Sequence, residues 1–271
     1  MELIDIGVNL AHESFSHDLP EVLERAAAAG VHRMVVTGTS VEATRAALQL
    51  HRRYPARLFA TSGLHPHHAS EFDAGVRDAL RELASQPGVV AVGECGLDYY
   101  RNFSPREAQL SAFAGQLEIA VETGLPVFLH QRDAHADFMA VLRDYLPRLR
   151  AAVAHCFTGQ QHELEECLAA GLYVGITGWI CDERRGRHLL PMMPLVPADR
   201  LMIETDAPYL LPRSLKPAPS TRRNEPGFLP EVARVVAGAR NESVETLAEA
   251  TTATAVRFFA LPPGPGPGQG A

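Results

Sequence analysis

The chain has 271 residues, of which 46% are hydrophobic and 21% are charged, and it carries a formal net charge of −7. This composition is that of an ordinary globular protein, and the length suits one α/β barrel, a fold of about 250 residues. The acidic balance argues against a protein that coats long nucleic acids, although a local basic pocket would still permit transient action at a strand end.

The sequence predicts neither a targeting segment nor disulfides. No segment approaches ~20 consecutive apolar residues, and Met1–Leu10 lacks the basic start and long apolar run of a secretory signal. The four cysteines show no CxxC spacing and are expected to be reduced thiols. We therefore expect a cytoplasmic protein that is a monomer without a membrane span or an obligate protein partner.

Short β-branched or apolar runs alternate along the chain with amphipathic helical segments. The predicted strands are Leu3–Leu10, Arg33–Thr39, Leu58–Leu64, Val89–Leu97, Pro126–Arg132, Ala151–Phe157, Leu172–Gly178 and Arg200–Asp206. The predicted helices are Leu19–Ala29, Val41–His51, Val76–Ala84, Glu107–Glu122, His135–Tyr145, Gln161–Ala170, Glu183–Leu190 and Val244–Phe259. Alternation at this spacing indicates parallel strands joined by crossover helices.

Eight such strands predict one domain over residues 1–260, a (β/α)₈ TIM barrel. An open doubly wound sheet would usually carry a glycine-rich phosphate loop after its first strand, but Asp5–Asn9 contains no GxGxxG pattern. The last helix should pack on the outside of the barrel or cap one of its ends. The Pro- and Gly-rich tail, residues 261–271, cannot bury apolar area and is predicted to be disordered.

Polar residues follow five predicted strands at their carboxyl ends, where TIM barrels place their active sites. These segments are Gly63–His68, Gly93–Asp98, Leu129–Asp133, Ala154–Phe157 and Ile203–Pro208. Residues two apart in a strand share a face. This alternation groups Glu94 with Val90 and Val92, His130 with Phe128, His155 with Val153, and Asp206 with Met202 and Glu204.

The apolar members of these groups suit a barrel interior, so Glu94, His130, His155 and Asp206 should converge there. Two imidazoles and two carboxylates suit Zn²⁺, Mn²⁺ or Mg²⁺, and such a metal lowers the pKa of a bound water to about 7. A single histidine at a strand end is more often a hydrogen-bonded rim residue than a ligand. Four ligand-type residues at matching depth favour a metal-dependent hydrolase.

Several neighbouring residues are expected to play lesser parts. We predict that His67 and His68 are solvated in a loop, and that Cys95 and Cys156 face the helices. We also predict that Glu204 supports the metal ligands, and that Arg184 and Arg185 are solvated charges on a helix.

Nine segments, taken in order, carry a more specific signal. They are Asp5–Leu10, Gly63–Pro66, Gly93–Asp98, Pro126–His130, His155–Gly159, Gly175–Trp179, Cys181–Gly186, Glu204–Leu210 and Arg222–Pro226. Together they resemble the TatD family of metal-dependent deoxyribonucleases, from Asp5 to about Phe259. The resemblance implies a TIM barrel with Mg²⁺-dependent 3′→5′ exonuclease activity on single-stranded DNA and RNA, and a role in DNA repair.

The resemblance also implies roles for individual residues. Glu94, His130 and His155 match the family's metal ligands, and Asp206 matches its carboxylate at the metal and the attacking water. His65 matches an active-site histidine near the substrate phosphate. Asp206 would then act as the general base, beside a catalytic Glu94.

The first strand departs from the pattern of the broader superfamily, many of whose members begin with a His-x-His pair. Gly7 and Asn9 occupy these positions. Asn9 can offer an amide to a ligand, whereas Gly7 has no side chain. We therefore expect one firmly bound metal, with a second completed by the substrate phosphate.

Three arginines are candidates for gripping phosphate oxygens: Arg132, Arg222 and Arg223. For the last two, an exposed loop ion pair is the competing interpretation. Trp179, and after it Tyr99 and Tyr209, can stack on an unpaired base or simply pack at the rim.

Two other functions remain open at this point. A metal-dependent amidohydrolase acting on a small cyclic amide or ester would use the same end of the barrel. A nucleic-acid-binding module without chemistry would bind without metal, and the acidic charge counts against it.

Overall fold

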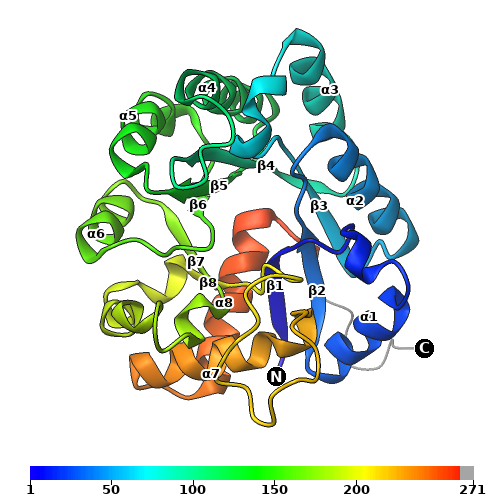
Figure 1. The fold of residues 1–271 in the computed structure, drawn as a ribbon, viewed down its shortest axis with the longest axis vertical. Coiled ribbons are helices and arrows are strands. Elements are labelled where there is room, and N and C mark those ends of the chain that lie inside the picture. Colours follow the sequence, from blue (N-terminus) through cyan, green and yellow to red (C-terminus); the bar gives the residue numbers. More distant parts are fainter. Residues whose placement is uncertain (263–271) are drawn as a thin grey trace.

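A computed structural model describes residues 1–262, and its centre is a nearly closed barrel of parallel strands ringed by helices (Figure 1). The strands, in both chain order and spatial order, are β1 (Leu3–Val8), β2 (Val31–Val36), β3 (Leu58–Ser62), β4 (Val89–Asp98), β5 (Val127–Arg132), β6 (Ala152–Ala154), β7 (Tyr173–Ile176) and β8 (Leu201–Ile203). The predicted TIM barrel is confirmed.

Helices follow most of the strands and cover the outside of the barrel. The α-helices are α1 (Leu19–Ala28), α2 (Val41–Arg53), α3 (Ala74–Ala84), α4 (Arg106–Thr123), α5 (His135–Tyr145), α6 (Gln161–Ala169), α7 (Leu229–Arg240) and α8 (Val244–Phe259). The 3₁₀ helices that border the site are η2 (Pro66–Glu71), η4 (Gly178–Cys181) and η5 (Arg187–Leu195).

The segment between β7 and β8 differs from the prediction. The helix expected at Glu183–Leu190 is wrong, because residues 183–186 form a turn and the chain then continues as the 3₁₀ helix η5. Pro191 and Pro194 lie inside η5, and proline has no N–H for an α-helical hydrogen bond. The helix α7, which was not predicted, instead lies between β8 and α8.

The core consists of two layers. One cluster fills the barrel and includes Ile6, Val35 and Phe128, while a larger one lies between the strands and the surrounding helices. Near its end α8 contributes Phe258 and Phe259 to the inner cluster, so this helix closes one end of the barrel. Figure 1 shows α8 behind the strands, at the end opposite the viewer.

Strand β4 breaks the predicted alternation just before its glutamate. Val90 lies in the inner cluster, but Val92 lies in the outer one, and the pairing with β5 shifts register between Val92 and Cys95. A Cβ atom on Gly93, which has a φ of +133°, would lie 2.1 Å from the carbonyl oxygen of Phe128. The irregularity lets Glu94 point into the barrel although Val92 points out.

The seam between β8 and β1 is closed differently from the other strand pairs. In the described chain, regular pairing joins β1 through β8 but not β8 to β1. Across this seam the Asp206 amide donates to Gly7 O at 2.8 Å, and the Asn9 amide donates to Ala207 O at 2.8 Å. The buried carboxylate of Asp5 adds two bonds from Thr205, one from its amide at 2.9 Å and one from its hydroxyl. Asp5 therefore closes the barrel beside the segment that carries Asp206.

Asp5 should make stability pH-dependent, because burial raises its pKa from 3.8 to about 7. Between these values the folded state binds more protons than the unfolded state, so this contribution to stability falls as pH rises. From about pH 6 to about pH 8 the loss should be about 1 kcal/mol. The Asp5→Asn variant should lack this loss in urea unfolding, whereas Glu249→Gln, at an exposed site, should retain it. Identical pH dependence in wild type and Asp5→Asn would contradict the prediction.

Two further predictions concern a disordered tail at the end of the chain and the lack of a membrane-spanning helix. Leu261 is only 5% exposed and packs in the inner cluster, whereas residues 263–271 of the predicted disordered tail lie outside the described residues. Over residues 1–262 we find no helix with both the length and the apolar character needed to cross a membrane.

Candidate active site

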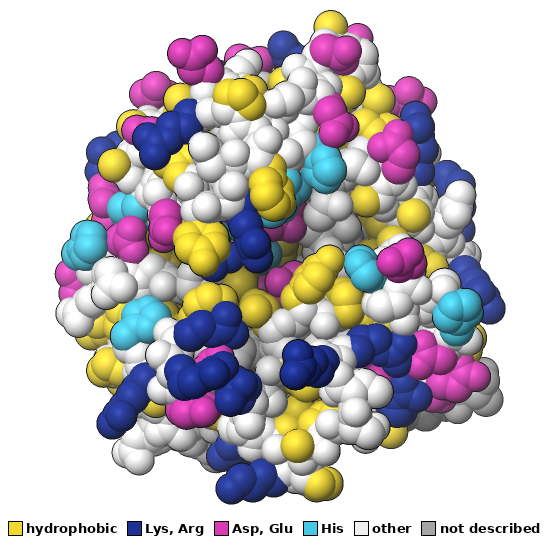
Figure 2. Space-filling model, in the orientation of Figure 1, with side chains coloured by type: hydrophobic (Ala, Val, Ile, Leu, Met, Phe, Trp, Pro, Cys, Tyr) yellow, Lys and Arg dark blue, Asp and Glu magenta, His cyan; other side chains and the backbone are white. Residues whose placement is uncertain are grey.

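A cavity of about 860 Å³ opens at the carboxyl ends of the strands, and Figure 2 shows the hollow at the centre of this face. Eight of the ten predicted site residues line it: Asn9, His65, Glu94, His130, Arg132, His155, Trp179 and Asp206. Arg222 and Arg223 do not lie among its lining residues.

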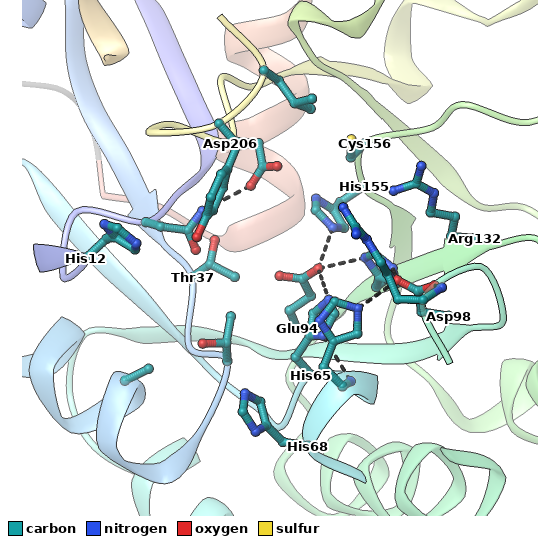
Figure 3. Close-up of a pocket in the computed structure, with 18 of the residues that line it drawn as sticks. His12, Thr37, His65, His68, Glu94, Asp98, Arg132, His155, Cys156 and Asp206 are labelled. Carbon is teal, nitrogen blue, oxygen red and sulfur yellow. Dashed lines mark hydrogen bonds and ion pairs between the residues drawn. The ribbon is translucent and has the colours of Figure 1, made fainter. Parts of the chain in front are cut away.

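The carboxylate of Glu94 is the centre of the polar cluster. Its Oε1 atom lies 2.8 Å from Nε2 of His155, 2.9 Å from Nδ1 of His130 and 3.3 Å from Nε2 of His65 (Figure 3). Burial alone would raise the pKa of Glu94, but its interactions with His155 and His65 and the hydrogen bonds from His130 and His155 hold that pKa well below 4.5. Glu94 is therefore ionised, and one of its oxygens contacts three imidazole rings, one from β5 and two from the segments that follow β3 and β6.

The far nitrogens of two rings are held by carboxylates. Nδ1 of His155 lies 3.3 Å from Oε2 of Glu204, and Nε2 of His130 lies 3.3 Å from Oδ2 of Asp98. When a carboxylate accepts a hydrogen bond from the N–H of one ring nitrogen, the other nitrogen keeps its lone pair free for a metal. This arrangement is usual for histidines that bind metals. His155 Nε2 and His130 Nδ1 are thus oriented as ligand atoms toward Glu94.

His65 is oriented in the opposite way. Its Nδ1 accepts a hydrogen bond from the amide of His67 at 3.1 Å, so Nε2 carries the proton in the neutral ring. Burial lowers the pKa of His65 to about 4, which keeps the ring neutral at physiological pH. The ligand atoms of His65, Glu94 and His130 lie within 4.8 Å of one another. The hydrogen bonds nevertheless make His65 a donor rather than a metal ligand.

This donor set fits a divalent metal. It offers one ionised carboxylate oxygen and two neutral-ring nitrogens, a combination used for Zn²⁺ and Mn²⁺ and compatible with Mg²⁺ through its oxygen ligands. Without a cation, Glu94 and its neighbouring carboxylates outweigh burial and raise the pKa values of His130 and His155. A bound cation would take the place of those protons.

Glu204 occupies the space in which a side chain at position 7 would have to lie. A Cβ atom on Gly7 would be 2.2 Å from Oε2 of Glu204, and one on Gly175 would be 2.5 Å from its Oε1. The fully buried Glu204 also accepts the Cys156 amide at 2.5 Å. A histidine side chain at position 7 would therefore collide with Glu204. In this chain the carboxylate of Glu204 occupies that space and contacts Nδ1 of His155.

Asp206 lies beside Asn9, on the side of the cavity opposite His68 (Figure 3). The side-chain amide of Asn9 donates to Oδ1 of Asp206 at 3.0 Å, and Asp206 has a φ of 54°. Burial raises the pKa of Asp206 to about 7. The carboxylate is therefore poised to exchange a proton near neutral pH.

Several polar residues lie in places that were not predicted. Asp98 accepts a bond from His67 Nε2 at 2.9 Å, so the prediction that His67 is merely solvated is wrong. Asp98 lies on the same face of its strand as Glu94, a signal that could have identified it.

The two cysteines next to proposed ligands differ in position. Cys95 packs in the outer cluster as predicted, but Cys156 lines the cavity rather than facing the helices, because its φ of 45° turns the chain there.

Aromatic and cationic side chains alternate at the rim. The guanidinium carbon of Arg132 lies 4.0 Å from the ring centre of Tyr100 and 5.7 Å from that of Trp179, while that of Arg185 lies 4.3 Å from Trp179. Tyr100, which was not predicted, is 58% exposed. Tyr99 instead donates its hydroxyl to Asp137 at 2.7 Å and does not line the cavity.

Arg223 has a structural role in the loop after β8. Its guanidinium donates to Asp18 at 2.6 and 2.8 Å, and to the Ser14 carbonyl at 2.6 Å. The adjacent Asn224 donates to the Thr205 and Tyr209 carbonyls at 3.0 and 2.7 Å. These contacts hold the turn that carries Asp206. Arg222 is exposed and is not among the residues that line the cavity.

Comparisons with known proteins agree with this arrangement. A family model described as "TatD related DNase" matches residues 4–260. A "3′-5′ ssDNA/RNA exonuclease TatD" of Erwinia billingiae is 54% identical over 260 residues, covering 96% of this chain and 100% of that protein. A crystal structure of a TatD homologue from Escherichia coli K12 has a TM-score of 0.87 at 29% identity and covers 96% of this chain and 98% of its own. A TatD family hydrolase from Entamoeba histolytica gives 0.86 at 27% identity, with coverages of 96% and 98%.

Proposed function

Because this chain belongs to the family of TatD-related DNases and is a metal-dependent nuclease, we propose that it removes nucleotides from the 3′ ends of single-stranded DNA and RNA. The observation that carries the proposal is the cluster of His130, His155 and His65 on one ionised carboxylate, Glu94, in an open cavity. The names of the relatives support the polarity and the substrate. Arg132 in the cavity lining favours a phosphate substrate over the cyclic amide or ester of the amidohydrolase alternative.

We propose Glu94, His130 and His155 as the metal ligands, with Asp206, which lies near His155, as a further group able to contact the metal. Mg²⁺ is the metal that the family resemblance implies, and the two imidazoles suit Mn²⁺ or Zn²⁺ equally well. When bound, the metal would supply positive charge that polarises a phosphate oxygen and orients a water.

We assign each of the remaining steps of hydrolysis to a residue of the chain. Asp206 accepts the proton of the attacking water, whose oxygen bonds to phosphorus while the bond to the 3′ oxygen of the preceding nucleotide breaks. His65, whose Nε2 lies 3.3 Å from Glu94, would donate its Nε2 proton to a phosphate oxygen or to the departing 3′ oxygen when substrate is bound. Arg132 pairs with non-bridging oxygens, Asn9 holds Asp206, and Trp179 provides a face on which a base can stack.

The proposed setting follows from the substrate. Trimming of single-stranded 3′ ends is a step that DNA repair requires, and we propose that the enzyme acts in repair, in the cytoplasm and as a monomer. No obligate protein partner forms part of the proposal, since the described chain supplies every group that this chemistry uses.

The function is tested with single-stranded DNA labelled at its 5′ or its 3′ end. A 3′→5′ exonuclease releases labelled mononucleotide at once from the 3′ label and shortens the 5′-labelled strand stepwise. EDTA should abolish both signals, and a series of Mg²⁺, Mn²⁺ and Zn²⁺ should restore them to different extents. Shortening from the 5′ end, or turnover that survives EDTA, would overturn the proposal.

Gly7→Ala should weaken metal binding although position 7 touches no metal ligand. The new methyl group would collide with Glu204, which would have to release His155. Loss of such a supporting contact typically costs about 10–100-fold in metal affinity. Competition with a chromophoric chelator would measure the change. Gly238→Ala, where a Cβ meets no atom within 4 Å in the described structure, is the matched control. Unchanged affinity in Gly7→Ala would rule out the role given to Glu204.

A further inference from the structure

Three arginines beside the cavity share one buried carboxylate, which the chemistry above does not use. Asp182, only 2% exposed, has its Oδ2 2.9 Å from Nε of Arg185, and its Oδ1 3.5 Å from Nε of Arg184 and 3.8 Å from Nε of Arg213. The Arg184 amide also donates to Oδ1 at 2.9 Å. Burial opposes ionisation, but these bonds hold the pKa of Asp182 at about 2. Asp182 thus hydrogen-bonds Arg184 and Arg185 through their Nε atoms, and it lies within ion-pair distance of Nε of Arg213.

The outer edges of the three guanidinium groups face solvent. The side chains of Arg184, Arg185 and Arg213 are 62%, 54% and 45% exposed. Arg213 makes one further contact, 3.6 Å to the exposed Glu183. Three cations facing two acids leave a local positive excess on a chain of net charge −7. A guanidinium held by Nε keeps its terminal amines free, and these form paired bonds with phosphate oxygens.

The cluster continues the wall of the catalytic cavity. Arg185 and Trp179 both line the cavity, and the Trp179 indole N–H donates to the Arg185 carbonyl at 3.3 Å. A Cβ atom on Gly186 would lie 1.9 Å from the Trp179 carbonyl, so the arginine turn is pressed against η4. Figure 2 shows Lys and Arg side chains gathered beside the opening, around acidic ones. Trp179 thus links the basic cluster to Arg132 within the cavity.

We propose that Arg184, Arg185 and Arg213 form a second nucleic-acid subsite, which binds the phosphodiester backbone of the strand where it leaves the cavity. The inference rests on the proposed function, in which the 3′ end enters the cavity. A cavity of about 860 Å³ is of the size that encloses a drug-sized ligand, so a longer strand must cross the rim. The alternating aromatic and cationic groups suit an unpaired strand, since bases stack on rings and phosphates pair with cations.

The test compares a short and a long substrate in the double variant Arg184→Gln/Arg213→Gln, neither of whose sites lines the cavity. Hydrolysis of the dinucleotide dT2 should keep its kcat/KM within about twofold, because that substrate ends inside the cavity. For dT12, two lost phosphate contacts should flatten the slope of log(kcat/KM) against log[salt] by about 1.4. Between about 50 and about 200 mM salt, wild type should therefore lose about sevenfold more activity on dT12 than the variant.

Arg77→Gln/Arg81→Gln is the matched control, since it removes two ion-paired arginines from α3, away from the cavity. It should retain the wild-type salt slope. Anisotropy of labelled dT12 with phosphorothioate linkages gives the same comparison without turnover. An unchanged slope, or equal losses on dT2 and dT12, would overturn the subsite. Failure of wild type to hydrolyse either strand would instead contradict the proposed function. The salt dependence of dT12 binding, measured by anisotropy in wild type and variant, would then still test the subsite.

Discussion

Replacing Glu94 with glutamine is expected to lower kcat for release of the 3′-terminal nucleotide by about 10³-fold or more. Glu94 is the one ionised group that both His130 and His155 face at less than 3 Å. Loss of its charge removes a metal ligand, and a metal's charge stabilisation of the transition state, several kcal/mol, corresponds to about that factor. The same variant should bind the metal weakly enough for dialysis to remove it.

The control for this variant lies in the same cavity. Glu42 also lines it, but its side chain is 80% exposed, and within residues 1–262 its one ion-pair partner is Arg45, at 4.0 Å. Glu42→Gln should therefore keep kcat within about threefold, since exposed pairs contribute little. Both variants should unfold at nearly the wild-type temperature because glutamine preserves shape. Metal content and turnover at wild-type levels in Glu94→Gln would refute the central role of this carboxylate.

The barrel could be predicted from the sequence because each buried strand is a short apolar run and each helix repeats apolar residues on one face. The same rule would have found α7, where Leu229, Val232, Ala233, Val236 and Ala237 recur at helical spacing and are all buried. It failed at Glu183–Leu190, where only the last two residues are apolar and two prolines follow within the next turn. Alternation failed in β4, since a register shift depends on how close Gly93 comes to β5.

The cavity lining was largely predictable because strand ends of a TIM barrel meet at one rim. Contacts between distant segments were not. The sequence shows Arg223 as half of a basic pair, but Asp18, which binds it, lies 205 positions earlier. Likewise, the sequence alone suggests that Gly7 is a lost metal ligand. The structure shows that Glu204 fills the space that a side chain at position 7 would need. The tautomer of His65, which separates donor from ligand, depends on the amide of His67.

Asp206→Asn should lower kcat by about 10³-fold while leaving the fold intact. Oδ1 of Asp206 is already occupied by Asn9, which leaves the other oxygen free to take a proton from water. A general base in position contributes about 10²–10⁴-fold, and an amide cannot accept that proton. Because burial raises the pKa of Asp206 to about 7, wild-type kcat/KM should rise with pH and level off near neutrality. A bound cation would lower this pKa, so the inflection should lie at or below pH 7.

Metal affinity then separates the two roles open to Asp206. If it acts only as the base, Asp206→Asn should bind the metal as tightly as wild type while turnover collapses and the low-pH limb of the profile disappears. If it is also a ligand, the chelator competition should show a loss of affinity alongside the loss of kcat, as in Glu94→Gln. The hydrogen bond that Asp206 accepts from the side chain of Asn9 favours the first result. Turnover within about tenfold of wild type would exclude both roles, because either one alone should cost more.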